Sequence, residues 1–278
     1  MFKLARNLKA AKTSGVTRIL SFGGHNSNHI AALAAICKKE NLESIGIIRG
    51  EEPALLSDTL VKAQSDGMKL KFVSRGRYSL KNDDDFISSL RSEFGEIYII
   101  PEGGSNMQGV LGCMDIIDPA WEYDYVICAC GTGTTFAGIM ASGIDKFSVI
   151  GMSVLKGTNT LPGSVTRLLN QTFPGKQVPP VQDHIRDLAN GKIYAIINTY
   201  AFSGFAGYDD NVHAFKINFE ERYKIPLDYI YTSKLFYGVF DLFSRYVFPA
   251  SSKVLVIHSG GLQGNAAFEK RYQLNARR

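Results

Sequence analysis

The sequence predicts an α/β fold made of two open parallel-sheet domains, and three features support this class. Short apolar segments of strand length alternate with segments of helical length. This alternation is typical of parallel sheets whose strands are joined by crossover helices. From Gly103 onward, glycine-rich loops precede the helices and aromatic residues become more frequent. We therefore expect a smaller α/β domain over residues 1–104 and a larger one over residues 105–278.

The smaller domain is expected to begin with a basic amphipathic helix that ends before Gly15. Its expected helices cover residues 2–14, 28–40, 54–65 and 83–94, and its expected strands cover residues 16–22, 44–48, 70–74 and 97–100. Gly67 lies just past the helix over residues 54–65, where a glycine suits a helix end. Acidic residues open the helix over residues 83–94, and they suit the positive end of a helix dipole.

The larger domain is expected to repeat the alternation of strands and helices. Its expected strands cover residues 123–130, 147–154 and 253–258, and its expected helices cover residues 134–142, 211–223 and 234–246. Residues 157–191 combine glycines, prolines and broken patterns, so we expect a long irregular or partly helical connection there. Residues 227–230 form a short β-type run ahead of Tyr231.

Composition limits the function classes. The chain has 278 residues, of which 45% are hydrophobic and 21% are charged, as in an ordinary soluble globular protein. The net charge of +5 suits anionic ligands, but no block of Lys and Arg indicates nucleic-acid binding. No apolar run reaches the roughly 20 residues that span a membrane, and no signal peptide opens the chain. We therefore expect a cytoplasmic protein that binds neither nucleic acid nor membrane.

Cysteine and histidine spacing gives no support to a metal site. The four cysteines lie in apolar segments without C-x-x-C spacing, so they are expected to be buried and reduced. The five histidines are scattered, without the H-E-x-x-H spacing of many zinc sites. We expect no bound metal.

Residues 21–36 contain a strand end, two glycines, a polar loop and an alanine-rich helix. Gly23 and Gly24 let the backbone turn sharply without a Cβ clash. Either Ser27 or Asn28 can cap the helix, which leaves free N–H groups for an anion or a polar ring. An ordinary capped turn explains the pattern equally well.

Residues 131–135 follow an apolar strand and open a helix with the sequence Gly-Thr-Gly-Thr-Thr. Backbone N–H groups and threonine hydroxyls at such a helix start suit a phosphate group. The loop lacks the lysine of a Walker A motif. Phe136 replaces the third glycine of a dinucleotide fingerprint, and Lys156 follows the next strand in place of a ribose-binding acid. A plain glycine turn is the alternative.

Four motifs together resemble one family. The sequences GGHNSNH (residues 23–29), IPEGGSN (100–106), GTGTT (131–135) and YTSK (231–234) occur in the order found in the 1-aminocyclopropane-1-carboxylate deaminase and D-cysteine desulfhydrase family. These are pyridoxal 5'-phosphate (PLP) enzymes with the fold type II, tryptophan-synthase-β-like architecture. The resemblance extends from Lys3 to about Gly261.

The resemblance implies a PLP-dependent lyase, hydrolase or deaminase that acts on a small amino acid and releases ammonia and a 2-oxo acid. It further implies a homodimer and a site between the two domains, at the carboxyl ends of the strands. The resemblance implies that Ser27 and Tyr231 act in catalysis and that His29 contacts the substrate. It implies that Asn28 bonds the PLP ring oxygen and that Ser259 bonds the pyridine nitrogen. The residues that it implies for the PLP phosphate are Gly131, Thr132, Gly133, Thr134 and Thr135. Residues 103–106 fit either a structural turn or a ligand contact.

The sequence departs from the family pattern in three places. Thr232 stands where several deaminases carry Glu, and His29 stands in place of a glutamine; both favour β-elimination from a D-amino acid. Ungapped alignment places the family's Schiff-base lysine one residue before Met1. An internal methionine taken as the start, or a degenerate relative, would explain this. The alternative function is therefore a non-catalytic protein that binds PLP or another phosphate ligand. Lys3 is expected to be a solvated helix lysine.

Overall fold

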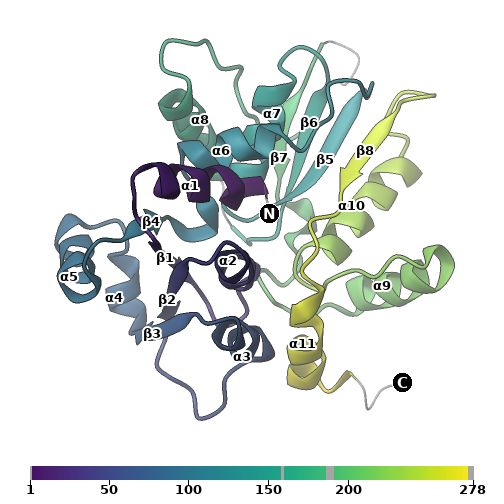
Figure 1. Cartoon of the computed structure of the whole chain (residues 1–278). Helices are drawn as coiled ribbons and strands as arrows, with labels where there is room; N and C mark the ends of the chain where they lie inside the picture. The colour runs from purple at the N-terminus through teal and green to yellow at the C-terminus, as the bar shows by residue number, and fades with distance from the viewer. Residues whose placement is uncertain (1, 158–159, 186–190, 275–278) are drawn as a thin grey trace. The chain divides into compact units, whose positions relative to one another are not determined.

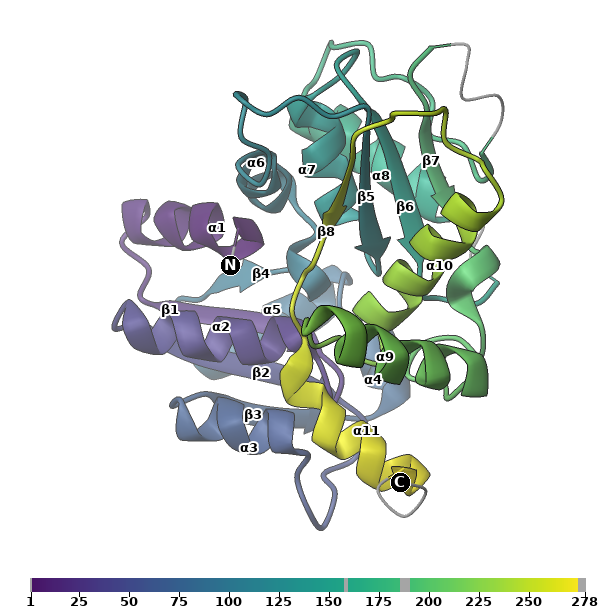
Figure 2. The same cartoon turned by 90° about the vertical axis from the view of Figure 1, so that its right-hand side faces the viewer.

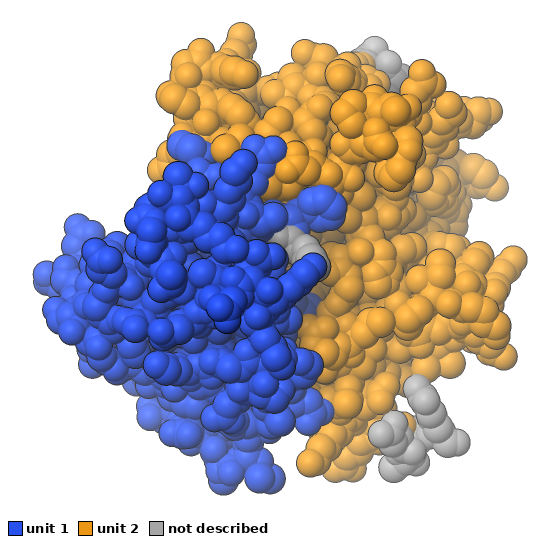
Figure 3. All heavy atoms as spheres, viewed as in Figure 1, with its two compact units in different colours: residues 1–108 blue, residues 109–278 orange. Residues whose placement is uncertain are grey.

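The computed structural model describes residues 2–157, 160–185 and 191–274. The chain divides into two compact units, Met1–Gln108 and Gly109–Arg278 (Figures 1 and 3). The division falls a few residues after the boundary that the sequence suggests at residue 104. Within the described residues each unit contains one four-stranded sheet, and each unit is considered by itself below.

The first unit is a parallel sheet with helices on both faces (Figure 1). Its strands are β1 (Arg18–Gly23), β2 (Glu43–Arg49), β3 (Lys69–Val73) and β4 (Tyr98–Ile100), in the order β3-β2-β1-β4. Its helices are α1 (Phe2–Thr13), α2 (Asn28–Lys39), α3 (Asp58–Ser65), α4 (Arg75–Ser79) and α5 (Asp84–Phe94), with the short 3-10 helix η1 (Glu102–Gly104) after β4. Helices α1, α2 and α3 pack on one face, and α4 and α5 pack on the other.

Side-chain caps set several helix starts in this unit. Ser57 accepts the N–H of Leu60 and begins α3 at Asp58, four residues later than the periodicity of the sequence suggests. Asp83 accepts two N–H groups at the start of α5. The first N–H groups of a helix have no partner within the helix and need an acceptor. A side chain that accepts them therefore decides where the helix begins, even where the preceding residues have a weak preference for helix.

The second unit has the same kind of architecture. Its strands are β5 (Tyr125–Cys130), β6 (Ser148–Ser153), β7 (Tyr194–Ile197) and β8 (Val254–Ile257), in the order β7-β6-β5-β8 and all parallel. Its helices are α6 (Met107–Met114), which begins two residues before the boundary, α7 (Thr134–Ser142), α8 (Leu161–Thr172), α9 (Asp210–Tyr223), α10 (Thr232–Ser244) and α11 (Asn265–Tyr272), with the 3-10 helices η2 (Thr199–Ala201) and η3 (Leu262–Gly264). Figure 2 shows α7 and α8 on one side of this sheet and α10 on the other, in agreement with two separate apolar clusters.

The two sheets share one strand order. In each, the first strand of the sheet lies between the second strand and the fourth, so the chain changes direction across the sheet at β1 and β4 and again at β5 and β8. Open parallel sheets bind ligands at the carboxyl ends of the strands where this change occurs. Three of the four sequence motifs follow β1, β4 and β5, and Ser259 follows β8.

Some expected elements differ from the structure. Residues 227–230 form no strand; a buried carboxylate folds them into a turn, as described below. The connection over residues 157–191 is partly helical, in agreement with one of the two expectations, because residues 161–172 form α8; residues 158–159 and 186–190 lie outside the described residues. The sequence patterns also missed α4, α6, α11 and β7, which are short and lack clear periodicity.

The structure also shows the surroundings of the cysteines and the character of the helices. Cys37, Cys113, Cys128 and Cys130 are all buried and free. Among the described residues, no group of three metal-ligating side chains could hold a metal ion. In the same part of the chain no helix combines the length and the apolar character that crossing a bilayer requires.

We predict that Gly138→Ala lowers the free energy of unfolding by about 1–3 kcal/mol, the usual effect of overpacking. A Cβ at Gly138 in α7 would lie 2.2 Å from Cys113 Cβ and 2.7 Å from the carbonyl oxygen of Val110 in α6. Gly163→Ala in α8 is the control, because nothing lies within 4 Å of its added Cβ; it should leave stability unchanged or raise it by about 0.5–1 kcal/mol. Urea unfolding measures both, and equal effects would contradict the packing described.

Candidate functional site

The loop after β1 is a tightly packed helix start. Ser27 has extended backbone angles and accepts the N–H of Ile30 at 3.3 Å, so Ser27, not Asn28, caps α2. A Cβ at Gly23 would lie 2.5 Å from Ile30 Cγ1 and 2.7 Å from Ser27 Oγ. Gly23 is therefore required because the first turn of α2 rests directly on the end of β1.

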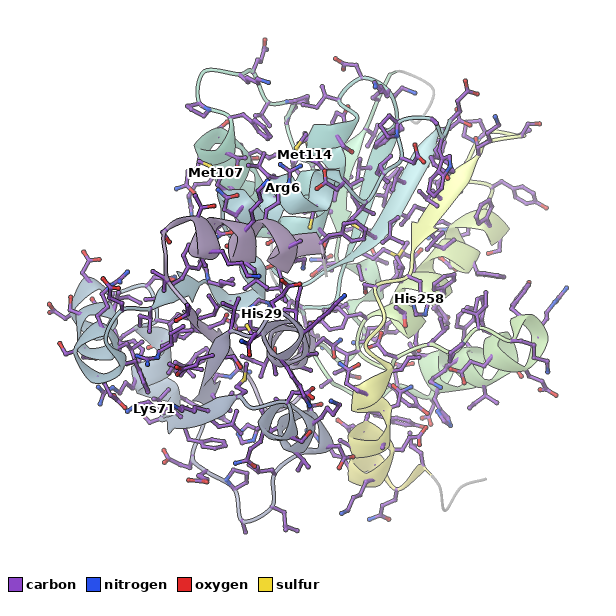
Figure 4. The ribbon with its side chains drawn as sticks, viewed as in Figure 1. Arg6, His29, Lys71, Met107, Met114 and His258 are labelled. Atoms are coloured by element: carbon purple, nitrogen blue, oxygen red, sulfur yellow. The ribbon has the colours of Figure 1, made fainter. Side chains whose placement is uncertain are left out.

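Ser21 joins this loop to the end of β4. Its hydroxyl oxygen lies 2.7 Å from the carbonyl oxygen of Ile100 and 2.7 Å from Nε2 of His29. The desolvation of the ring, and secondarily the nearby Lys3 ammonium, lower the pKa of His29 to about 3. The imidazole is therefore neutral near pH 7. Figure 4 labels His29 at the start of α2.

Lys3 differs from the solvated lysine expected from the sequence. A Cβ at Gly104, whose φ is +68°, would lie 3.3 Å from Lys3 Cβ and 3.8 Å from His29 Cε1. Lys3 is half-buried, and its stem packs against this turn. In the same turn the Asn106 amide donates to Asn7 Oδ1 at 2.7 Å. These contacts give the turn over residues 103–106 a structural role.

The glycine loop of the second unit begins α7. Gly133 has a φ of +82°, and a Cβ there would lie 2.5 Å from Val165 Cγ2, so only glycine fits without distortion. Gly133 has no side chain to accept the first N–H groups of α7, which remain available to an anion. The hydroxyl oxygens of Thr132 and Thr134 lie 3.0 Å apart beside these groups. The loop has the chemistry of a phosphate site.

Tyr231 lies directly against this loop. A Cβ at Gly131 would be 3.4 Å from Tyr231 Cε1 and 3.5 Å from its hydroxyl oxygen. Phe205 packs edge-on against the Tyr231 ring, with ring centroids 6.0 Å apart. The structure thus brings two sequence motifs together, since a phenol hydroxyl sits beside the loop that suits a phosphate.

A buried carboxylate sets the position of Tyr231. Asp228 is 1% exposed and accepts the backbone N–H groups of Ile230, Tyr231 and Thr232 at 2.9, 3.0 and 2.7 Å. This bonding folds the segment into a turn where alternating apolar residues suggest a strand. The Ser233 hydroxyl donates to the Asp228 carbonyl oxygen at 2.7 Å and closes the same turn.

Lys234 is a second buried charge, and sequence reasoning missed its role. It is 1% exposed, and its amine donates to the carbonyl oxygens of Ala201 and Gly204 at 2.9 and 2.6 Å. Burial lowers its pKa from the ordinary 10.5 to about 8, against the opposite effect of Asp209 and Asp228. The lysine anchors the segment that carries Phe205. A lysine within an otherwise apolar helix was the available sequence signal.

Ser259 lies at the same sheet edge as the glycine loop. β8 pairs with β5 so that Ile257 is opposite Cys128, and Ser259 and Cys130 follow them by equal steps. Ser259 is exposed. Next to it in the chain is His258, which Figure 4 labels. Its Nε2 donates to the Pro226 carbonyl oxygen at 2.8 Å, and its Nδ1 accepts the N–H of Gly260 at 3.2 Å. These bonds tie the end of β8 to the segment that precedes Tyr231.

The predicted site residues therefore fall into two groups, one in each unit. In the first unit, Ser27, Asn28 and His29 lie on one helix start, with Ser21 and Lys3 beside His29. In the second unit, Gly131 of the loop over residues 131–135 lies against Tyr231, and Ser259 lies at the same sheet edge. The roles of these residues toward a ligand remain predictions.

Comparison with known proteins supports the resemblance. No family model matches the sequence. A Thermotoga maritima protein provisionally named 1-aminocyclopropane-1-carboxylate deaminase is 28% identical over 97% of this chain and 85% of its own length. The mitochondrial bifunctional D-cysteine desulfhydrase/1-aminocyclopropane-1-carboxylate deaminase of Arabidopsis thaliana is 27% identical over 88% of this chain and 64% of its length. A D-cysteine desulfhydrase of Klebsiella pneumoniae is 22% identical over 90% of this chain and 78% of its length.

Solved structures support the fold. The structure of a 1-aminocyclopropane-1-carboxylate deaminase homologue superposes with a TM-score of 0.79 and 23% identity, covering 98% of this chain and 83% of that one. A fungal L-serine ammonia-lyase from Rhizomucor miehei gives a TM-score of 0.60 with 14% identity, covering 98% and 87%. The expected fold class and the resemblance are confirmed. The relatives are named as deaminases and desulfhydrases, so the expected term hydrolase gains no support.

We predict that Lys234→Met changes the pH dependence of stability. The native amine has a lower pKa than the unfolded one, so between about pH 8 and 10 the unfolded chain binds more protons. The unfolding free energy of the parent should therefore rise with pH, by at most about 1.4 kcal/mol per unit from this group. The variant lacks this rise. The unfolding free energy of the variant should also be lower by about 1–3 kcal/mol, because two buried carbonyl groups lose their hydrogen-bond donor.

Urea unfolding at pH 7, 8, 9 and 10 measures this dependence. Lys146→Met is the control, because Lys146 is exposed and should leave the pH dependence unchanged. The same slope in the parent and in Lys234→Met would contradict the role given to the buried amine.

Proposed function

We propose that the chain is a PLP-dependent lyase or deaminase that acts on a small amino acid and releases ammonia and a 2-oxo acid. One observation carries the proposal: the Tyr231 hydroxyl lies against Gly131, in a glycine loop whose helix start is suited to phosphate. A group that can move protons thus stands beside a phosphate site, in a chain similar to deaminases and desulfhydrases.

The residues present fit PLP. A cradle for the phosphate requires backbone N–H groups that a ligand can approach closely, and Gly131 and Gly133 carry no side chain that could cover these groups. In this proposal Thr132, Thr134 and Thr135 add hydroxyl donors for the phosphate. When bound, PLP supplies an electron sink that weakens the bonds to the amino acid's α-carbon.

The remaining site residues position the ring and the substrate. We assign Asn28 to the PLP ring oxygen and Ser259 to the pyridine nitrogen. A serine hydroxyl can donate to that nitrogen without giving it a full positive charge. Ser27 and His29 contact the substrate. Tyr231 holds or moves a proton through its phenol oxygen, for which its fixed place beside Gly131 provides the orientation.

Thr232 bears on the choice of substrate. It is fully buried, its hydroxyl donates to the Asp228 carboxylate at 2.8 Å, and it accepts the Asp228 N–H at 2.7 Å. This side chain serves the turn and supplies no carboxylate at the position where several deaminases carry Glu. D-cysteine, which would yield pyruvate, ammonia and sulfide, is therefore the preferred substrate over 1-aminocyclopropane-1-carboxylate.

The direct test adds PLP to the purified chain and follows its visible absorption, then measures ammonia, pyruvate and sulfide from D-cysteine. Ammonia and 2-oxobutyrate from 1-aminocyclopropane-1-carboxylate are measured in parallel. Borohydride reduction and peptide mapping identify any lysine that holds PLP. PLP binding without turnover of either substrate would support the alternative expected from the sequence, a non-catalytic phosphate-ligand-binding protein. No binding of PLP would contradict both functions.

We predict that Thr132→Val weakens PLP binding by about 10–100-fold, because it removes one hydrogen bond to a charged phosphate. The substitution preserves the shape of the loop, whereas any side chain at Gly133 would collide with Val165. Thr166→Val in α8 is the control, since its hydroxyl donates to the Pro162 carbonyl oxygen within the helix. Fluorescence titration with PLP measures both. Unchanged affinity in Thr132→Val would remove Thr132 from the cradle.

We predict that Ser27→Ala slows turnover by about 10²–10⁴-fold if its hydroxyl relays a proton, with PLP affinity largely intact. The loss of the α2 cap costs about 1 kcal/mol of stability in addition. Ser74→Ala separates the two effects, because Ser74 caps α4 by the same bond and lies outside the predicted site. Steady-state kinetics and urea unfolding are compared. A variant that loses stability but retains full turnover would leave Ser27 only its capping role.

A further inference from the structure

Helix α11 holds the turn that carries Tyr231. The side-chain oxygen of Asn265 accepts the N–H of Tyr229 at 3.3 Å, and its amide donates to the Leu227 carbonyl oxygen at 2.9 Å. The Phe268 ring stacks on the Tyr229 ring, with centroids 4.5 Å apart and an interplanar angle of 6°. The residues that precede Tyr231 are therefore fixed by a helix that follows the last strand.

The same helix anchors the loop that carries Phe205. The Tyr272 hydroxyl donates to the Ala206 carbonyl oxygen at 3.0 Å. On the other side of Phe205, the Lys234 amine donates to the Gly204 carbonyl oxygen at 2.6 Å. The two carbonyl groups that flank Phe205 are thus held by side chains from two different helices.

This loop needs anchors because its backbone is strained. Phe202 and Ala206 have φ values of +50° and +52°, in the left-handed region where a Cβ is unfavourable. Such conformations persist only where the surrounding structure fixes them, and they cluster at functional sites. The loop presents an apolar ring, because Phe205 is 43% exposed. A ring that is so exposed gains little from burial, so the anchors serve the position of the ring more than the apolar core.

The Phe205 ring limits where the Tyr231 ring can lie. The two rings meet edge-on, with centroids 6.0 Å apart and an interplanar angle of 75°. We propose that Tyr272 is a positioning residue: through the loop that it anchors, it holds the Phe205 ring against Tyr231. It thereby keeps the Tyr231 phenol beside Gly131. The position rests on contacts within the second unit, and its value for a reaction rests on the proposed function.

The consequence concerns the rate of the chemical step more than binding. A phenol that moves a proton must be aimed at its target, and the Tyr272 hydroxyl is already bonded to a carbonyl group. Tyr272→Phe should therefore lower kcat by about 10–100-fold, since a misplacement of about 1 Å can have this effect, and leave KM largely unchanged. α11 lies outside the four sequence motifs, so none of them indicates this role.

The test is NMR of the full chain with ¹³C-labelled tyrosine rings, in which the Tyr231 signals are assigned by their loss in Tyr231→Phe. Phe205→Leu shows the Tyr231 signals without the ring-current shift of Phe205. Tyr272→Phe should move the Tyr231 signals toward those of Phe205→Leu. Tyr194→Phe is the matched control, because it also removes one hydroxyl hydrogen bond, with the Asp145 N–H at 2.9 Å, past the end of α7 that is remote from the glycine loop. It should lower the unfolding free energy and leave the Tyr231 signals unchanged.

The outcomes separate positioning from a merely structural role. Tyr231 signals that stay as in the parent in Tyr272→Phe, or that do not move in Phe205→Leu, would overturn the proposal. If Tyr272→Phe does not fold, Ala206→Gly is added, because glycine adopts a φ of +52° without strain. The double variant still lacks the anchor and should show the same shift; parent-like Tyr231 signals in it would also overturn the proposal.

Steady-state kinetics with D-cysteine complete the test. A displaced Tyr231 with unchanged kcat would overturn the link between the position and the reaction. The NMR readouts require neither PLP nor turnover, so an absence of turnover in the parent contradicts the proposed function alone, and the Tyr231 signals still decide the role of Tyr272.

Discussion

Parallel strand pairing is the constraint on which the candidate site depends. Hydrogen bonds between β1 and β4, and between β5 and β8, bring segments that are far apart in the chain to one edge of each sheet. Because all strands in a sheet point the same way, their following loops meet at that edge. The loop after β1 thereby reaches the end of β4 through Ser21, and the glycine loop after β5 lies at the same edge as Ser259. Neither of these two arrangements could be predicted from a local sequence pattern.

Buried polar groups then fix the details at these edges. Removing a charge or a hydroxyl from water is costly unless its partners are in place, so such groups restrict the conformations available to their neighbours. Asp228 has three backbone donors and Lys234 has two carbonyl acceptors. Between them they set the turn that carries Tyr231 and the segment that carries Phe205. Ser21 does the same for His29. The candidate site thus owes its geometry to residues that are not themselves expected to touch a ligand.

Much of the fold could be predicted from local patterns. The alternation of apolar and helical segments located most strands, and the helix over Thr134–Ser142 has the expected bounds because a glycine loop and a glycine end enclose it. Prediction failed where distant partners decide the structure. Residues 227–230 alternate like a strand, but the carboxylate of Asp228 accepts the N–H groups of Ile230 and Tyr231 and folds the segment into a turn. Lys234 could not be assigned from sequence, because its acceptors lie about 30 residues earlier. The motif residues of the site were found by their glycines and hydroxyls; the buried groups that orient them were not.

The shared strand order also governs where this architecture can absorb change in chain length. β1 and β5 each have a neighbouring strand on both sides, so an insertion after either strand would lie between the loops that follow its two neighbours. β3 and β7 are edge strands, and the loops that follow them lie beside only one neighbour. Surface connections of that kind tolerate insertions and sequence drift. This architecture can therefore change in chain length after β3 and β7 while the loops after β1 and β5 keep their length.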